Sequence, residues 1–143
     1  MTEFPKIFRI RQSFPAPRLE DVAGEVHRQL SRLPLHERVQ PGQTVAITAG
    51  SRGIANYLQI LQAVVQHFHQ LGAAPFVTPA MGSHGGGTAE GQLAVLASYG
   101  ITPETVGCPI RSSMETVIVC QTPLGFPVYF DRHAFQADHV LVV

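Results

Sequence analysis

Residues 44–53 have the sequence Thr-Val-Ala-Ile-Thr-Ala-Gly-Ser-Arg-Gly, and this stretch decides the fold. Its first half, Thr44–Thr48, is rich in strand-forming residues and too short for a helix, so it predicts a buried strand. Ala49–Gly53 predicts a loop. Apolar residues then recur at helical spacing over Ile54–Leu71, and Gly72 provides a C-terminal stop. The stretch and its continuation therefore predict a strand, a loop and a long helix.

The same succession follows immediately along the chain. Pro75–Pro79 predicts a second strand, Gly82–Gly87 a second loop, and Thr88–Tyr99 a second helix that ends at Gly100. Strands that alternate with amphipathic helices predict a parallel sheet with right-handed crossovers. If the two strands pair, both loops lie at the carboxyl edge of the sheet, where open parallel sheets bind their ligands.

The flanking segments complete the predicted domain. Ile7–Phe14 alternates like a short strand, and an apolar stripe over Leu19–Leu33 predicts a helix. Thr116–Gln121 and Phe126–Phe130 predict a hairpin, and His139–Val143 predicts a buried parallel strand. The fold class is therefore α/β: a Rossmann-like parallel sheet flanked by helices, with a β-hairpin insertion before the last strand. The expected central strands are Thr44–Thr48, Pro75–Thr78 and His139–Val143.

Composition and charge exclude several classes of protein. With 143 residues, 45% hydrophobic and 14% charged, the chain has the make-up of one compact domain rather than a disordered segment. Ten basic residues balance ten acidic ones, so the basic surplus of nucleic-acid-binding domains is missing. No apolar run approaches the roughly 20 residues of a membrane span, and the charged N-terminus does not resemble a signal peptide. We expect a cytoplasmic protein with no nucleic-acid or membrane partner.

The second loop supplies the first candidate site residues. Consecutive glycines before a helix let backbone N–H groups turn toward an anion, so Gly82, Ser83, Gly85 and Gly86 predict an anion cradle. His84 lies among them with little apolar packing, and an imidazole suits proton transfer at neutral pH. We predict that His84 is a catalytic acid/base. The alternatives are glycines that serve only a tight turn and a histidine that is merely exposed.

The first loop supplies two companions, Ser51 and Arg52. An arginine at a strand end can hold a carboxylate or phosphate in bidentate fashion, and Ser51 can add a hydroxyl donor. The alternative for Arg52 is that it caps a neighbouring helix terminus. Neither loop has the glycine fingerprint of a dinucleotide site or the lysine of a phosphate loop, so the expected ligand is another small anion.

The remaining histidines are expected to be structural. His67 and His69 lie two residues apart on a predicted helix, about 200° around its axis, so they cannot share a metal. We place both on a solvated face. Asp131 and His133 are interpreted as a polar turn, with an acid–histidine pair as the alternative.

The two cysteines carry no recognisable chemistry. Cys108 and Cys120 lack the spacing of a metal site, and we expect both to be small apolar fillers in a reducing compartment. No metal ligand is assigned in this chain.

The two loop motifs, in this order of elements, resemble the N-terminal domain of the nickel-pincer-dependent lactate racemase family. The resemblance covers roughly Thr44 to Val143, and its most specific element is the Gly-x-His loop around His84, followed by the Ser51-Arg52 loop. The resemblance implies that the loop histidine is a catalytic acid/base. It also implies that the loop arginine helps hold the anionic substrate or cofactor.

The resemblance further implies a nickel-pincer nucleotide as cofactor. In that family the lysine that tethers it, the histidine that binds nickel and the second acid/base histidine lie beyond the point that corresponds to Val143. We therefore expect residues 1–143 to be one domain of a longer two-domain protein, inactive alone, with the missing C-terminal domain as a partner. The buried-looking final strand leads us to expect an exposed apolar face and self-association as a homo-oligomer.

The implied reaction is the racemisation or epimerisation of a 2-hydroxy acid. Hydride leaves the carbon that bears the hydroxyl while a base takes the hydroxyl proton, and the 2-keto acid is then reduced on either face. The chain has Ala49 where the family has an aspartate, and Gly85 where it has an arginine, so a hydroxy acid or sugar acid other than lactate is expected. The alternatives are a non-catalytic anion- or phosphometabolite-binding module and an inactive truncated product.

Overall fold

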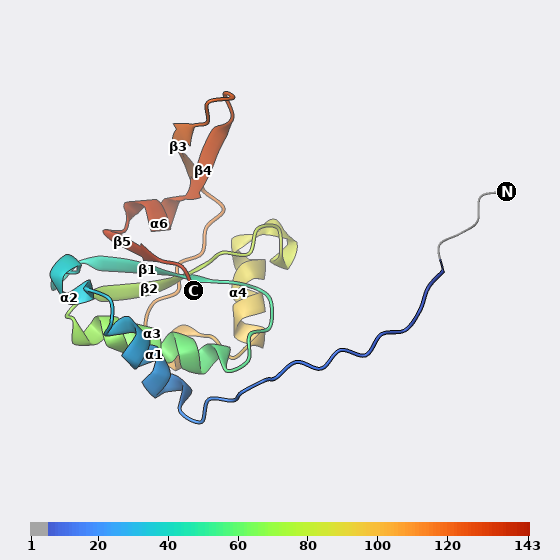
Figure 1. Ribbon diagram of the computed structural model, residues 1–143. Coiled ribbons are helices and arrows are strands. Elements are labelled where there is room, and N and C mark those ends of the chain that lie inside the picture. The colour runs from blue at the N-terminus through green and yellow to red at the C-terminus, as the bar shows by residue number, and fades with distance from the viewer. Residues whose placement is uncertain (1–5) are drawn as a thin grey trace.

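The computed structural model describes residues 6–143 and confirms the α/β fold (Figure 1). A three-stranded parallel sheet of order β2-β1-β5 is packed with helices, and an antiparallel β3-β4 hairpin precedes the last strand. The elements, in chain order, are α1 (Val22–Leu30), α2 (Leu35–Arg38), β1 (Thr44–Ala49), α3 (Tyr57–Gln70), β2 (Ala74–Pro79), the 3-10 turn η1 (Gly85–Gly87), α4 (Ala89–Ser98), α5 (Pro103–Val106), β3 (Thr116–Gln121), β4 (Pro127–Asp131), α6 (Arg132–Gln136) and β5 (His139–Leu141).

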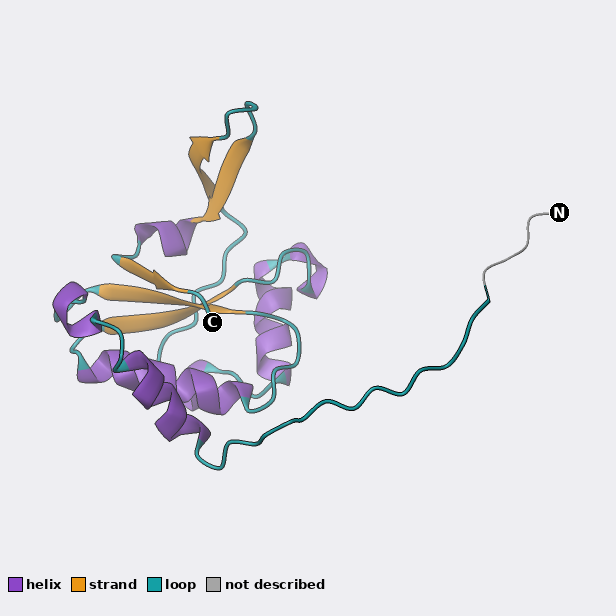
Figure 2. Ribbon diagram, viewed as in Figure 1, coloured by secondary structure: helices purple, strands orange, loops and turns teal. Residues whose placement is uncertain are grey.

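The sheet has helices on both faces (Figure 2). Val45 and Ile47 of β1 belong to the main core, which also contains Leu61 and Phe68 of α3. Ala46 faces the opposite side, where it packs with Phe76 of β2 and Ala134 of α6. Because both faces of β1 are covered, its sequence is a continuous apolar run, as expected for a central parallel strand.

The register of β1 and β2 positions the two predicted site loops. Thr48 pairs with Thr78 and Ala49 with Pro79, so the strands end level with one another. The loops that follow β1 and β2 therefore lie side by side at the carboxyl edge of the sheet, as the sequence predicts. Helix α3 begins at Tyr57 rather than Ile54, because Asn56 has a left-handed backbone (φ +60°) that a continuing helix excludes.

The predicted strand at Ile7–Phe14 is wrong. This segment, part of residues 6–18 (hereafter the arm), is extended and exposed, and none of the described strands pairs with it. A strand needs a neighbouring backbone to pair its N–H and C=O groups, and alternation alone does not supply one. The predicted helix over Leu19–Leu33 is shorter than expected, because Asp21 caps α1 by accepting a hydrogen bond from the N–H of Gly24 (2.8 Å).

The prediction of a buried, central final strand is also wrong. β5 is parallel, as expected, but it pairs only with β1 among the described strands and is partly exposed, with Val140 at 39%. β2 is likewise an edge of this sheet, extended only by a single bridge between Val77 and Ile110. An apolar run predicts burial only where other elements cover both faces, and α6 leaves β5 partly uncovered.

Helix α3 also corrects the expectation for His67. This side chain is buried, and its ring lies 5.8 Å from that of His27, because α1 packs along this flank of α3. Burial lowers the pKa of His67, and the neighbouring His27 lowers it further. His69 is exposed, as predicted, with Nε2 3.2 Å from the carbonyl oxygen of Gly107.

The two cysteines differ from one another. Cys108 is buried, as a filler should be, and burial raises the pKa of its thiol to about 11. Cys120 is exposed on β3, so the prediction that it fills apolar space is wrong. Asp131 caps α6 by accepting a hydrogen bond from the N–H of Ala134 (2.8 Å), so the segment interpreted as a polar turn is the start of a short helix.

Candidate functional site

Ser51 and His84 are in contact where the first and second loops meet. The Ser51 hydroxyl oxygen and the Nδ1 atom of His84 are within hydrogen-bonding distance. The two residues follow β1 and β2, whose ends are level. The parallel register therefore brings together two side chains that are far apart in the sequence.

Two tyrosines hold the first loop in place. The Tyr99 hydroxyl donates a hydrogen bond to the carbonyl oxygen of Ser51 (2.5 Å). The hydroxyl of the buried Tyr57 accepts one from the N–H of Gly50 (2.6 Å). Burial raises the pKa of Tyr57, and the bond from Gly50 opposes this shift without cancelling it, so the phenol stays neutral at physiological pH. Sequence reasoning missed both tyrosines, although a hydroxyl on the apolar side of a helix needs a partner and is itself a signal.

The second loop packs tightly on the first turn of α4. The buried Gln92 donates from Nε2 to the carbonyl oxygen of Gly82 (2.8 Å). Gly85 has a φ of +66°, and a Cβ there would lie 2.4 Å from the carbonyl carbon of Gly91. Glycine is therefore required at position 85 by both conformation and space. Gln92 is a third residue, after Tyr57 and Tyr99, that the sequence pattern did not indicate.

A hollow of about 370 Å³ opens beside the contact between Ser51 and His84. Arg52 and His84, both largely exposed, contribute to its wall. Its apolar side is formed by Ile54 and Met81, and none of its lining residues carries a carboxylate. The lining residues are Gly50, Ser51, Arg52, Ile54, Ala80, Met81 and His84. The arrangement suits a small anion whose charge meets Arg52 and whose apolar part meets Ile54 and Met81.

The glycines of the second loop are placed differently from His84. Gly82 lines a smaller hollow of about 190 Å³ at the base of the hairpin, whereas Ser83, Gly85 and Gly86 line neither hollow. The N–H of His84 bonds to the carbonyl oxygen of Met81 (3.2 Å) and so serves the turn rather than an open cradle. The anion cradle stays a prediction, and the structure brings Ser51, Arg52 and His84 together without it.

The part of the chain that the structure describes contains no group of three or more His, Cys, Asp or Glu side chains able to hold a metal ion. Over the same residues, no helix has the length and apolar character that crossing a membrane requires.

No protein-family model matches the chain, and none of the curated proteins matches it. The resemblance to the racemase family therefore rests on the loop motifs and their order.

Proposed function

We propose that this chain is the substrate-holding and proton-transferring domain of a 2-hydroxy acid racemase or epimerase. The observation that carries the proposal is the contact between Ser51 and His84 on the wall of a hollow that Arg52 also lines. An acid/base, its orienting hydroxyl and an anion-binding guanidinium are the groups that such a reaction needs within reach of one small substrate.

The contact with Ser51 favours a role for His84 in which it both takes and returns a proton. With Nδ1 engaged by Ser51, Nε2 is the ring nitrogen available to a substrate. In the neutral tautomer with a free Nε2 lone pair, the Ser51 hydroxyl oxygen accepts a hydrogen bond from the Nδ1 N–H, and it accepts from the same N–H in the imidazolium that forms when Nε2 takes a proton. His84 can therefore take the substrate's hydroxyl proton and later return it, and both steps occur in a racemisation. Tyr99 and Tyr57 keep Ser51 in position for this role.

Arg52 is assigned to the carboxylate of the substrate. A guanidinium binds a carboxylate through two parallel N–H groups and so fixes its orientation. The lining of the hollow has no carboxylate of its own to compete for Arg52. Ile54 and Met81 offer an apolar wall for the substituent on the reacting carbon, so the proposed substrate is a small 2-hydroxy acid.

Transfer of the hydroxyl proton does not by itself invert the carbon, and in the proposed reaction the hydrogen on that carbon leaves as hydride and returns to the other face. The resemblance implies a nickel-pincer nucleotide, which would supply the hydride-accepting chemistry. The described residues offer no three-ligand metal group, so they do not fit as its nickel site. We therefore assign the cofactor to a second domain and derive no step through it. Hydroxy acid binding and proton transfer are the tasks we assign to residues 50–54 and 81–84.

Ligand binding tests the proposal on this chain directly. We expect sodium lactate, glycerate or gluconate to shift the NMR signals of Ser51, Arg52 and His84, and propionate, which lacks the hydroxyl, to bind more weakly. Arg52→Ala should weaken binding by about tenfold or more, the worth of roughly one charge-assisted hydrogen bond. Arg32→Ala, a charge loss on an exposed segment that lines none of these hollows, serves as the matched control. Equal weakening by both variants, or no response to any hydroxy acid, would contradict the assignment.

The reaction class has its own test in the protein joined to its cofactor-bearing domain. A substrate deuterated at the hydroxyl-bearing carbon should keep its deuterium through inversion in ordinary water if hydride is transferred and returned. Loss of deuterium to solvent would instead indicate proton abstraction at carbon. Binding that is unaffected by His84→Ala, with no inversion of any hydroxy acid by the joined protein, would favour the non-catalytic anion-binding module.

A further inference from the structure

The β3-β4 hairpin is an exposed two-stranded ribbon that projects from the body of the domain (Figure 1). Ile118 and Tyr129 are direct cross-strand partners and are 59% and 60% exposed. Phe126, next to β4, is exposed as well. A two-stranded ribbon is marginally stable in water, and a third strand paired along its edge is one way to stabilise it. The hairpin therefore has an open place for one more strand.

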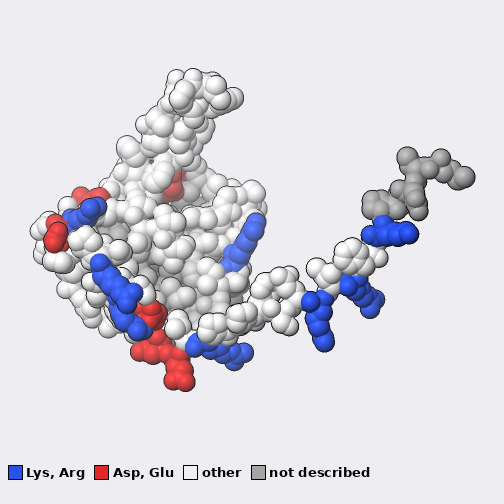
Figure 3. Space-filling view, in the orientation of Figure 1, with Lys and Arg blue, Asp and Glu red and all other residues white. Residues whose placement is uncertain are grey.

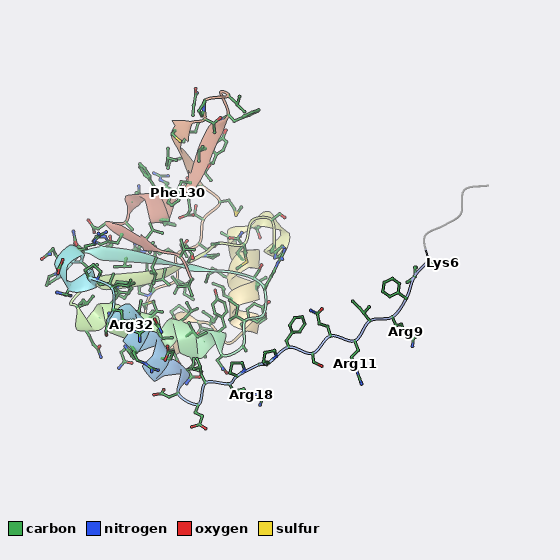
Figure 4. The ribbon with its side chains drawn as sticks, in the orientation of Figure 1. Lys6, Arg9, Arg11, Arg18, Arg32 and Phe130 are labelled. Carbon is green, nitrogen blue, oxygen red and sulfur yellow. The ribbon has the colours of Figure 1, made fainter. Side chains whose placement is uncertain are left out.

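The arm has the pattern of such a strand. Within Ile7–Phe14, one face of an extended backbone would present Phe8, Ile10 and Phe14, and the other would present Arg9 and Arg11. In the structure the segment is extended and exposed, with Ile7 at 97% (Figure 4). A two-faced extended segment is what β-strand addition recognises: its backbone completes the sheet edge and its apolar face covers the partner's side chains.

Charge favours contact between the arm and the body of the chain, while residues 116–130 of the hairpin carry no charged side chain. Residues 6–18 carry the basic side chains of Lys6, Arg9, Arg11 and Arg18 and no acidic residue, as Figures 3 and 4 show. Residues 19–143 carry six basic and nine acidic residues. The arm and the remainder of the chain thus have opposite net charges, which steers the arm toward the body of this same protein.

The topology indicates which copy the arm meets. The arm leads into α1, which packs with α3 on one face of the sheet, whereas the hairpin adjoins α6 on the other face (Figure 1). Pro15 and Pro17 lie just before α1, and prolines favour an extended course over a tight reversal. We infer that Ile7–Phe14 adds as a third strand to the β3-β4 hairpin of a second copy of the chain. Reciprocal exchange of arms gives a symmetric dimer, because each copy has one arm and one hairpin.

Light scattering across the micromolar range tests this inference. The unaltered chain should form a dimer, and the double variant Phe8→Asp with Ile10→Asp should be monomeric, because aspartates would face the apolar ribbon. Ile7→Asp is the control: it places one aspartate on the opposite face of the arm and should stay dimeric. Ile7, Phe8 and Ile10 are all exposed in the monomer, so these changes should leave the core folded, and circular dichroism checks this. A monomeric unaltered chain, or equal loss of dimer in all arm variants, overturns the inference.

Hairpin variants test the other half of the contact. Ile118→Asp with Tyr129→Asp should also give a monomer, whereas Leu124→Asp in the hairpin turn should not. An equal mixture of the arm variant and the hairpin variant should form a heterodimer, because one intact arm can still meet one intact hairpin. Folding of each arm onto its own hairpin predicts no heterodimer and overturns the exchange. So does an arm that instead binds vesicles with anionic lipid while the protein stays monomeric. Because the arm and hairpin variants leave Ser51, Arg52 and His84 unchanged, hydroxy acid binding is scored separately.

Discussion

β1 and β3 are similar in sequence and opposite in environment. Both are six-residue strands rich in β-branched residues, Thr-Val-Ala-Ile-Thr-Ala and Thr-Val-Ile-Val-Cys-Gln. In β1 nearly every residue is buried, because parallel strands flank it and helices cover both faces. In β3 nearly every residue is exposed, because its one partner is β4 and no helix covers the ribbon. Apolar character predicts that a segment is a strand, but burial depends on what packs against it.

The largest expected effect is a loss of stability when a phenylalanine is removed from the core, compared with the removal of one beside the hairpin. Phe68→Ala removes a fully buried side chain of α3 and should cost about 3–5 kcal/mol of stability, since it leaves a cavity in the main core. Phe126→Ala beside the hairpin turn should change the stability of the monomer by about 0.5 kcal/mol or less. Urea denaturation of the two variants measures both. Similar costs would mean that the hairpin packs against something within the monomer.

A second prediction places the chemistry in the body of the domain and not at the hairpin. In a protein that joins this chain to the proposed cofactor-bearing domain, His84→Ala should lower kcat by about 10²–10⁴, the usual contribution of a general acid/base. Ser51→Ala should lower kcat less and shift the pH profile, because it acts through the orientation and protonation of His84. His133→Ala, on α6 beside the hairpin, is the control and should leave steady-state kinetics unchanged. A His84→Ala variant that turns over substrate at the wild-type rate would contradict the assignment of His84 as the acid/base.

A third prediction concerns why the second loop, in the body of the domain, needs glycine at position 85. Gly85→Ala should destabilise the domain by about 1–3 kcal/mol, because it adds a Cβ against the backbone of Gly91 at a positive φ. Gly86→Ala, whose φ is also positive but whose Cβ would meet nothing within 4 Å, should cost about 1 kcal/mol. Thermal unfolding compares the pair. Equal costs would show that conformation alone, and not packing on α4, requires glycine at position 85.

The smallest effect concerns pH and the seam between α1 and α3. The pKa of His67 is lowered in the folded state, chiefly by burial and also by His27, so the unfolded chain takes up this proton more readily. The contribution of a neutral His67 to stability is therefore full above pH 6.5, its ordinary value, and is lost as the pH falls below it toward the lowered folded value. His67→Gln should flatten this part of the stability profile measured by urea denaturation. The exposed His69→Gln should leave it unchanged.

By itself, the sequence determined the kinds of elements and the two loops on which the proposed site lies. β1, β2 and α4 lie within about one residue of the predicted ranges, and the hairpin is where the alternation indicated. Local periodicity and glycine stops are properties of neighbouring residues, and so they can be recognised without a fold. The same holds for Ser51, Arg52 and His84, whose residue types in loops after strands pointed to one site before any distance was known.

Tertiary structure alone decided which residues are buried and which side chains meet. Alternation in Ile7–Phe14 could not reveal that no described strand pairs with it, and the apolar run at His139–Val143 could not reveal an edge position. His67 is buried because α1 lies over it, and Tyr99 holds Ser51 because α4 ends beside the first loop. Each of these outcomes depends on contacts between segments far apart in the chain, and such contacts leave no local periodicity in the sequence.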